Sequence, residues 1–306
     1  MRIRKPGKIN DHLWLLGREE SCIYLLKGQR ESLIISGGMS YLVPDILDQF
    51  EAWGIELTQI RKLLILHAHF DHLGVVPFLK NRHPGLEIFA STRAWEILGM
   101  PKAINTINEF SRDVAKRMGM ADVYASHDLD WQDDIEGKEV SEGDRFDLGD
   151  LDVHIYETPG HSSCSISAYV PQLKAIFASD GGGVPYKETI FTPGNSNFTK
   201  FQQSLEKIKD LDVAYVCADH FGYVAGEEAK DFFKRAIELA KQERALLEAV
   251  YMRTKDIDLA AREVVDAFAE EHPDYLLTPE ISLAVYRQVF RHIASNFHKY
   301  SIFNSQ

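Results

Sequence analysis

Four side chains that can bind metal ions stand close together in the segment Leu66-His67-Ala68-His69-Phe70-Asp71-His72. The segment directly follows an apolar run that is typical of a buried strand. Alternate side chains of an extended chain lie on the same side, so the first two histidines can reach one ion. The chain then turns, and the aspartate and the last histidine can reach a second ion. Imidazole and carboxylate groups together suit zinc, iron or manganese.

A pair of ions needs more ligands than this segment supplies, and three later positions can complete the set. His161 stands after a predicted strand, and the Pro-Gly turn before it would hold its side chain in a fixed direction. Asp180 is followed by three glycines, which let the backbone pass close to the ions. His220 closes the last predicted strand. A histidine at a strand end is usually a hydrogen-bonded surface residue, but the first cluster makes all three positions candidate ligands.

Other residues near these positions have a simpler interpretation. Cys164 offers a thiol three residues after His161, but we favour a small, partly buried side chain. His154 falls within a predicted strand, and His292 on the last predicted helix is interpreted as solvent-facing. Five aromatic residues are candidates either for a substrate pocket or for the core: Phe70, Tyr186, Phe221, Tyr223 and Tyr286.

The composition limits the classes of function. The 306 residues, with a hydrophobic share of 45%, can hold one large domain and a smaller accessory unit. The net charge of -12 disfavours binding to nucleic-acid backbones, which requires a basic field. Three widely spaced cysteines argue against a disulfide framework. The N-terminus lacks the apolar run of a signal peptide, and no stretch reaches membrane-spanning length. We therefore expect a cytoplasmic protein.

Strand and helix patterns alternate through the first part of the chain. Short apolar runs predict strands at 13–16, 23–26, 32–35, 63–66, 86–90, 146–148, 153–156, 165–170, 175–178 and 213–217. Helical spacing predicts helices at 41–53, 75–79 and 198–211, and a helical insertion at about 93–130. Strand, helix and strand in succession predict a layered α/β fold. We expect the insertion to cover one edge of the metal site.

The last part of the chain is almost wholly helical. Amphipathic patterns predict three helices, at 232–250, 257–268 and 281–297. No glycine-rich linker precedes them, so we expect this part to pack on the α/β body or to form a dimer contact. The chain is thus divided into a catalytic domain, 1–225, and a helical C-terminal extension, 226–306.

The order of the candidate ligands resembles the metallo-β-lactamase superfamily of binuclear hydrolases. The likeness covers residues 9–223. It implies a four-layer αββα sandwich, here with a helical insertion and a helical C-terminal extension, and with the metal site along one edge of the two sheets. By position, it implies that the first ion is bound by His67, His69 and His161. It implies that the second ion is bound by Asp71, His72 and His220, and that Asp180 bridges the two.

The cluster, the insertion and the helical tail are also similar to a narrower group. This is the thioesterase-like branch that contains the quinolone-signal response protein of pseudomonads. Many superfamily members carry Asp where this chain has Ser36, and Thr or Ser where it has Leu66. The resemblance gives that Asp a role in orienting a ligand or the activated water. True lactamases usually carry cysteine in place of Asp180, which brings this chain nearer to thioesterases and phosphodiesterases.

The resemblance implies a hydrolase in which a hydroxide between two divalent ions attacks a carbonyl carbon or a phosphorus atom. We rank zinc ahead of iron and manganese, and a small thioester, ester or lactone first among substrates. Asp71 and Asp180 are the candidate catalytic residues, with coordination as the first role of Asp71 and proton transfer as its second. We expect neither nucleic acid nor a membrane as a partner, and a homodimer through the helical tail stays open.

Three alternatives remain. A small-molecule phosphodiesterase would use the same ions. An iron-dependent sulfur or oxygen redox enzyme fits less well, because oxygen reductases of this fold carry Glu where this chain has His69 and add a flavin domain. A metal-stabilised regulatory protein stays open because of Ser36. Substrate identity depends on pocket walls that the insertion and the tail supply.

Overall fold

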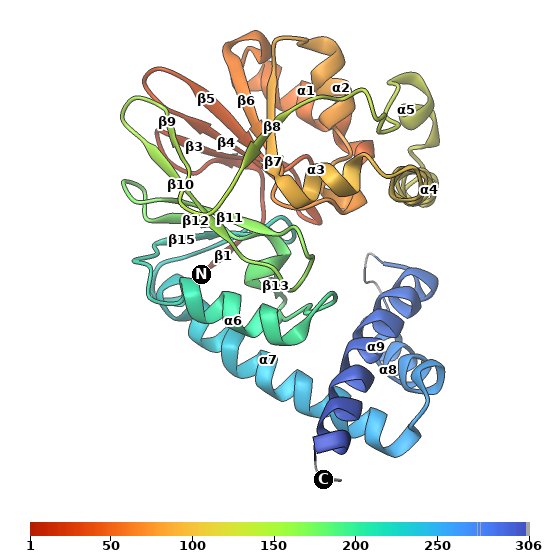
Figure 1. Cartoon of the computed structure of the whole chain (residues 1–306). Helices are drawn as coiled ribbons and strands as arrows, with labels where there is room; N and C mark the ends of the chain where they lie inside the picture. Colours follow the sequence, from red (N-terminus) through yellow and green to blue (C-terminus); the bar gives the residue numbers. More distant parts are fainter. Residues whose placement is uncertain (274, 276, 304–306) are drawn as a thin grey trace.

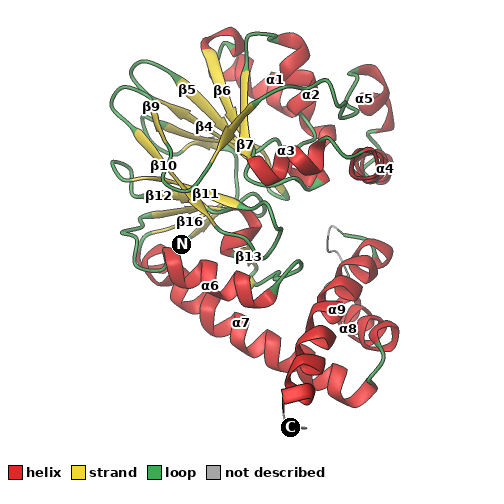
Figure 2. Ribbon diagram, in the orientation of Figure 1, coloured by secondary structure: helices red, strands yellow, loops and turns green. Residues whose placement is uncertain are grey.

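Two β-sheets pack face to face and helices cover their outer faces (Figure 2). A computed structural model describes residues 1–273, 275 and 277–303 of the chain, with side chains up to residue 295. Figure 1 shows the helices of the first half on one side of the paired sheets and those of the second half on the other. This is the four-layer αββα sandwich that the resemblance implies, and it confirms the layered α/β fold expected from the residue patterns.

The N-terminal sheet has the strand order β2-β3-β4-β5-β6-β7-β8. Its strands are β2 (Gly7–Lys8), β3 (Leu13–Arg18), β4 (Ser21–Lys27), β5 (Ser32–Ile35), β6 (Ile60–Leu64), β7 (Glu87–Ser91) and β8 (Lys138–Val140). Strands β2 to β5 pair antiparallel, and β5 to β8 pair parallel. The parallel strands all end at the same edge, so the segment that follows β6 must lie there.

The second sheet has the strand order β1-β16-β15-β12-β11-β10-β9. Its strands are β1 (Arg2–Ile3), β9 (Arg145–Asp147), β10 (Asp152–Glu157), β11 (Ile166–Val170), β12 (Ala175–Phe177), β15 (Tyr215–Cys217) and β16 (Tyr223–Ala225). Only β12 and β15 pair parallel among the described strands of this sheet. A separate hairpin, β13 (Val184–Tyr186) and β14 (Thr189–Phe191), follows β12.

Helices form the outer layers and the tail. Those on the first sheet are α1 (Val43–Ala52), α2 (Val76–Arg82), α3 (Thr92–Leu98), α4 (Pro101–Arg117) and α5 (Ala121–Ser126). Those on the second sheet and in the tail are α6 (Phe198–Ile208), α7 (Glu227–Thr254), α8 (Ile257–Glu271) and α9 (Pro279–Phe303). Four short 3-10 turns complete the described elements: η1 (Ser40–Leu42), η2 (Leu57–Gln59), η3 (Phe70–His72) and η4 (Ser179–Gly182).

The side chains of the central strands alternate between the two faces of their sheet, and this explains the layers. In β4, Tyr24 and Leu26 lie in the core between the two sheets, whereas Ile23 and Leu25 lie in the core under the helices of the first sheet. Successive strand residues point to opposite faces, so a strand covered on both faces is apolar throughout. Each such side chain contributes roughly 1.5–3 kcal/mol when fully buried.

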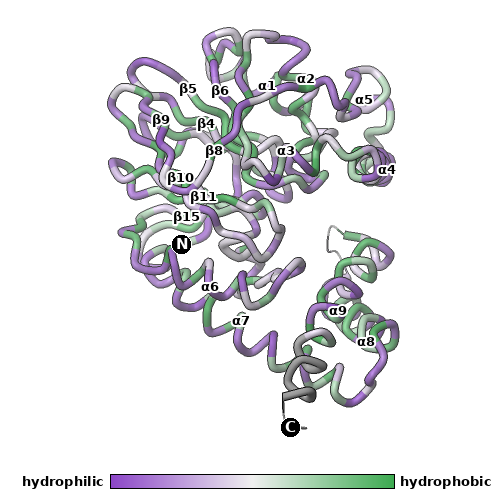
Figure 3. The backbone as a smooth tube through the Cα atoms, viewed as in Figure 1, coloured by the Kyte–Doolittle hydropathy of each residue, from purple (hydrophilic) through white to green (hydrophobic). Residues whose placement is uncertain are grey.

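The tail packs on the α/β body, which was one of the two arrangements expected for it. Phe232 and Ala236 of α7 share a core with Phe201 and Leu205 of α6. Figure 3 shows hydrophilic and hydrophobic residues alternating along α7, as expected for a helix with one buried face. In the part of the chain that the structure describes, no helix combines the length and the apolar character needed to cross a membrane.

The structure differs from the sequence prediction just before the metal cluster. Strand β6 ends at Leu64, two residues earlier than the apolar run. The Ile65 amide still donates to the Phe89 carbonyl of the first sheet, but the Leu66 carbonyl accepts from Ile166 of the second sheet. This link therefore crosses from one sheet to the other. The predicted helix 198–211 ends at Ile208, and the short strands β1, β2, β8, β13, β14 and β16 were not predicted.

Candidate metal centre

The seven predicted ligands converge at one edge of the paired sheets. They fall into two groups, and within each group the ligand atoms lie within 4.8 Å of one another. The groups are His67, His69 and His161, and Asp71, His72, Asp180 and His220. Four loops supply them: the loop after β6 with η3, the β10–β11 loop, η4 after β12, and the β15–β16 loop.

A glycine lets the loop that carries His161 approach α6. Gly160 has φ +140°, and a Cβ atom at this position would lie 2.2 Å from the backbone nitrogen of Phe201. Any larger residue would push the loop away from the helix and move His161 with it. The Pro-Gly turn therefore directs this histidine, as the sequence predicts.

Three other residues around the centre have strained backbones. Ser36, Ser179 and Phe221 have φ values of 71°, 47° and 61°. Ser179 precedes Asp180 in the η4 turn. Phe221 follows His220 in the β15–β16 loop. A non-glycine residue in the left-handed region costs of order 1–3 kcal/mol and persists only where the surrounding packing enforces it. Such strain gathers at functional loops, and here it sets the direction of two candidate ligands.

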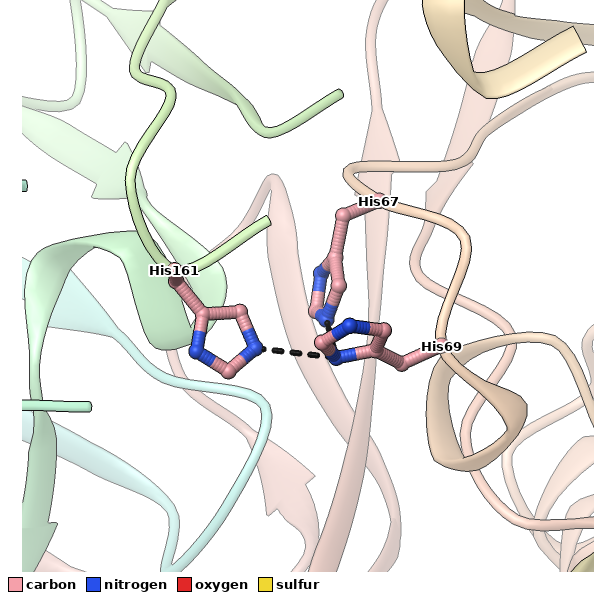
Figure 4. A group of neighbouring side chains, drawn as sticks. All are labelled: His67, His69 and His161. Atoms are coloured by element: carbon pink, nitrogen blue, oxygen red, sulfur yellow. Dashed lines mark hydrogen bonds between the residues drawn. The ribbon is translucent and has the colours of Figure 1, made fainter. Parts of the chain in front are cut away.

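The first group consists of three histidines whose rings point at one another (Figure 4). Nδ1 of His69 lies 3.1 Å from Nε2 of His67 and 3.0 Å from Nε2 of His161. Three nitrogens bound tetrahedrally to one zinc ion would lie about 3.3 Å apart. His67 and His161 are buried and His69 is partly exposed. The geometry matches three ligands of one ion.

The second group mixes two carboxylates with two histidines. Nε2 of His72 lies 3.5 Å from Oδ2 of Asp71 and 3.4 Å from Oδ2 of Asp180. Nε2 of His220 lies 3.4 Å from Oδ2 of Asp71 and 3.7 Å from Oδ1 of Asp180. Oδ2 of Asp180 also lies 3.5 Å from Nε2 of His161 in the first group. Asp180 therefore stands between the two groups, where a bridging ligand would be.

Hydrogen bonds on the far side of each ring fix which nitrogen faces the centre. Nδ1 of His161 donates to the Pro193 carbonyl at 2.9 Å, and Nδ1 of His220 donates to the Glu20 carbonyl at 2.6 Å. Nδ1 of His72 lies 2.7 Å from Oδ2 of Asp219. With Nδ1 held in this way, each ring turns Nε2 toward the carboxylates and the other histidines.

The electrostatics of the two groups differ. Burial lowers the pKa of His67, His161 and His69, the last to about 3, so these rings are neutral. Burial alone would also lower the pKa of His220, but the carboxylates of Asp180 and Asp71 outweigh it and raise this pKa to about 9. Neutral imidazole is the form that binds a metal, and the carboxylates balance cationic charge in the second group.

The residues fit a pair of divalent ions. Nε2 of His72 and Oδ1 of Asp180 are buried and have no hydrogen-bond partner among the described residues. A buried polar atom without a partner costs roughly 1–3 kcal/mol. A cation between these atoms would remove that cost, and imidazole and carboxylate are the ligands that zinc, iron and manganese accept.

Two residues that support the ligands were missed by the sequence analysis. Asp219 is buried and accepts hydrogen bonds through Oδ2 from His72 and from the Ser179 hydroxyl, at 2.7 and 2.6 Å. Oγ of Ser179 in turn lies 3.2 Å from Nδ1 of His67. The signal was present, because Asp219 adjoins His220 at the end of a strand and neighbouring side chains there point in different directions.

Ser36 lies beside the metal loop, at the position where the resemblance implies an Asp. Its side chain is buried, and its Oγ atom has no hydrogen-bond partner in the described part of the chain. The next residue, Gly37, donates from its amide to the His72 carbonyl at 2.8 Å.

A cavity of about 490 Å³ opens onto the centre. Five of the seven candidate ligands line it: His69, Asp71, His161, Asp180 and His220. Of the five aromatic residues considered for a pocket, Phe70 and Phe221 line this cavity, and Tyr286 lines a second, adjoining cavity. Tyr186 packs against Phe191 and Phe221 instead.

The remaining sequence candidates are not members of the two ligand groups. Cys164 is buried and its Sγ atom accepts from the Ala68 amide at 3.4 Å, as a small core residue would. His154 lies within β10, as predicted. His292 lies on α9 and is partly exposed.

Comparison with known proteins identifies relatives of this chain. The sequence model of the metallo-beta-lactamase superfamily matches residues 16–220. A metallo-beta-lactamase fold-containing protein of Sulfurisphaera tokodaii is 23% identical over 234 residues, which are 74% of this chain and 81% of that protein. The hydroxyacylglutathione hydrolase of Rhizobium meliloti is 32% identical over 135 residues, 44% of this chain and 38% of the hydrolase. The match thus spans well under half of that enzyme.

A solved structure shows the same fold. A metallo-beta-lactamase family protein from Thermus thermophilus superposes with a TM-score of 0.66 at 18% identity, over 93% of this chain and 94% of that one. Three observations agree on the family of this chain. They are the four-layer sandwich, the candidate ligands at the edge of its sheets, and the family match over two thirds of the sequence. This chain belongs to the metallo-beta-lactamase superfamily.

Proposed function

We propose that this protein is a binuclear metal-dependent hydrolase of a small thioester, ester or lactone. In this proposal His67, His69 and His161 bind one divalent ion, and Asp71, His72 and His220 bind the other. Asp180 bridges the two ions. The position of Asp180 carries the proposal, because Oδ2 lies 3.5 Å from His161 of the first group and 3.4 Å from His72 of the second.

A pair of divalent ions, when bound, activates water as a nucleophile near neutral pH and polarises the oxygen of the scissile bond. The protein residues hold this arrangement in place. The hydrogen bonds from Nδ1 of His72, His161 and His220 keep those rings from rotating. Asp71 is a ligand first, and a carboxylate in this position can also pass a proton to the leaving group.

Two polar side chains outside the ligand set line the cavity close to the centre. Asn195 and Tyr275 line the cavity together with the candidate ligands His161, Asp71 and Asp180. Burial and then the carboxylates of Asp180 and Asp71 raise the pKa of Tyr275, so its hydroxyl keeps its proton. We assign both side chains as donors to an oxygen of the substrate as charge develops there.

The cavity favours an ester or thioester over a phosphodiester. Most of its lining side chains are apolar, and the basic side chain among them apart from histidine, Lys102, is exposed. The charged groups that flank the phosphate in a nucleotide-like phosphodiester would have to lie against this wall without a basic partner, whereas the acyl group of an ester or thioester can be apolar throughout. The named activity of the Rhizobium relative, hydrolysis of hydroxyacylglutathione, is consistent with thioester chemistry.

Metal analysis together with a substrate panel tests the proposal. Purified protein loaded with zinc, iron or manganese should bind two ions per chain and hydrolyse a thioester, an ester or a lactone. His69→Ala and Asp180→Ala should each lose at least one ion and lower kcat/KM by a factor of about 100 or more. His154→Ala, a histidine on β10 outside the centre, and Asp150→Ala, an exposed carboxylate, are the matched controls.

The outcomes separate the alternatives. Hydrolysis of the phosphodiester alone would replace the proposed substrate class, and oxygen consumption by the iron form would replace hydrolysis. A protein that holds two ions and acts on nothing in the panel would favour a regulatory role. If either ligand variant retained both ions, the ligand assignment would be wrong.

A further inference from the structure

The cavity above the metal centre has two walls that come from the accessory parts of the chain. One wall is the helical insertion. It consists of Met100, which directly precedes α4, and of Ala103, Ile107 and Phe110 of α4. The facing wall is the helical tail. It consists of Leu277, which precedes α9, and of Ile281 and Val285 of α9. Figure 1 shows α4 and α9 beside the paired sheets, with α4 above α9 in this view.

The chemistry of these walls is nearly uniform. Apart from the candidate ligands, the polar lining residues are Lys102, Thr106, Asn195 and Tyr275. Lys102 and Thr106 are exposed on α4, at the outer part of the wall. Apart from the candidate ligands, the described walls therefore offer mainly apolar contacts, and they carry few charged side chains.

The volume is sufficient for more than a water molecule and a short acyl group. A cavity of about 490 Å³ lies within the range of roughly 300–1,000 Å³ that holds drug-sized ligands. Apolar side chains that face water in such a cavity gain free energy when an apolar ligand covers them, roughly 25 cal/mol per Å². The wall composition thus selects an apolar group rather than a polar one.

The two ends of a thioester differ in polarity, which decides its orientation. The thiol side of a soluble thioester carries charged or polar groups, and those require water or a basic partner. The basic side chain among the described lining residues, histidines apart, is Lys102 at the exposed part of α4. The acyl side is therefore the part that fits between α4 and α9.

We infer that the substrate carries a neutral, apolar acyl group that lies between α4 and α9, with its thiol or alcohol side directed to solvent near Lys102. This inference rests on the proposed function and names its substrate class. It separates this chain from the Rhizobium relative, whose named substrate has a hydroxyacyl group.

A second cavity adjoins the first. It has a volume of about 600 Å³, and it shares six lining residues with the first: Phe191, Pro193, Asn195, Tyr275, Leu277 and Val285. Its lining includes carboxylate side chains, those of Glu243, Glu263 and Glu271. These groups make the lining of the second cavity more polar than that of the first, so we place the acyl group in the first cavity.

A series of acyl thioesters with one common thiol tests the inference on the metal-loaded protein. From acetyl through butyryl and hexanoyl to octanoyl, kcat/KM should rise by up to about 4-fold for each methylene, the factor that corresponds to ~0.8 kcal/mol. A hydroxyacylglutathione should be a poorer substrate than the octanoyl thioester. Equal rates along the series, or a preference for the acetyl or hydroxyacyl group, would overturn the inference and leave hydrolysis itself intact.

Two variants fill the cavity from opposite walls. Val285→Trp on α9 and Ala103→Trp on α4 should each lower kcat/KM for the octanoyl thioester by about 10-fold or more, and change that for the acetyl thioester little. Ala284→Trp and Asn105→Trp place the same side chain on exposed positions of the same helices. Their kcat/KM values for both thioesters should match those of the parent protein. Equal losses on both thioesters in both cavity variants would contradict the inference.

Binding provides an arm that does not depend on turnover. Octanamide, a neutral analogue of the acyl product, should bind the parent protein in calorimetry with a negative heat-capacity change, and bind both cavity variants at least about 10-fold more weakly. If no ester or thioester is hydrolysed but octanamide binds in this pattern, the proposed function fails and the apolar site stands. If octanamide does not bind, the inference about the site fails.

Discussion

His72 and Asp219 form a buried pair behind the metal centre, with Nδ1 of His72 2.7 Å from Oδ2 of Asp219. The Asp219 side chain is 1% exposed. The same oxygen accepts from Ser179, whose Oγ atom lies 3.2 Å from Nδ1 of His67. One carboxylate thus orients a histidine of each group, directly in one case and through a hydroxyl in the other.

This pair predicts a selective loss of metal affinity. Asp219→Ala should weaken zinc binding by about 10–100-fold, because His72 loses the acceptor that holds its ring and its tautomer. Asp219→Asn keeps the shape and should weaken binding less. Competition with a chromogenic chelator measures the affinity. Asp147→Asn, an exposed carboxylate on β9, is the control, and equal affinities in the Ala variant and this control would contradict the positioning role.

Removal of metal is expected to destabilise the fold. Without a cation, Nε2 of His72 and Oδ1 of Asp180 stay buried without partners. Free metal at 100 times its Kd should raise the free energy of unfolding by about 2.7 kcal/mol over the chelated protein. Urea denaturation with zinc and with a chelator checks this. His69→Ala should narrow the gap between the two curves, and coincident curves for the parent protein would speak against a bound ion.

Glu243 on α7 should give a pH-dependent contribution to stability. Burial raises its pKa from 4.5 to about 7, against the effect of the Thr192 hydroxyl, which donates to its carboxylate at 2.5 Å. The folded state then holds this proton more tightly than the unfolded state, so stability falls as pH rises from about 4.5 to about 7 and stays lower above. The loss is at most ~3 kcal/mol.

The variant Glu243→Gln isolates this effect. The glutamine has no charge to bury. As pH rises from 5 to 8, the free energy of unfolding of this variant should therefore increase relative to that of the parent protein. Urea denaturation at each pH measures this difference. Glu238→Gln on the exposed side of α7 should follow the parent protein. A constant difference between Glu243→Gln and the parent across this range would show that the carboxyl group titrates normally.

Tyr275 connects the tail to the chemistry. Its hydroxyl lies in the cavity wall near Asp71 and Asp180 and keeps its proton. Tyr275→Phe retains the ring contacts with Tyr186 and Phe191, and should lower kcat about 10-fold with KM nearly unchanged, since a donor to developing charge acts mainly in the transition state. Steady-state kinetics on an activated thioester tests this, and a change in KM alone would assign the hydroxyl to ground-state binding.

Ser36 offers a gain in stability. Its φ of 71° suits glycine, and its buried hydroxyl has no partner in the described part of the chain. Ser36→Gly removes the strain and the unpaired group, against an entropic cost of roughly 0.5–1 kcal/mol, so we expect a net stabilisation of about 1 kcal/mol. Thermal unfolding measures it. Ser32→Gly, in the extended strand β5, should have the opposite sign, and a lower Tm for Ser36→Gly would contradict this account.

Local patterns in the sequence were sufficient for the layers and for the candidate ligands. The apolar runs that became β3, β4 and β5 alternate between two cores, and the histidines and aspartates follow such runs directly. Side chains at the ends of strands that share a sheet edge must gather there, so spacing along the chain predicts proximity in space. Helical spacing of apolar residues predicted the helical insertion at about 93–130, where the structure has α3, α4 and α5.

Tertiary structure alone decided how the gathered groups face one another. Asp180 lies between both groups because the strained η4 turn directs it there, and Asp219 reaches His72 across 147 positions of sequence. The short strands pair only through distant partners, and the wall that α9 presents to α4 depends on how the tail folds back. Such relationships arise from packing between segments far apart in the chain, and no local pattern of residues encodes a side chain's direction toward a partner that distant.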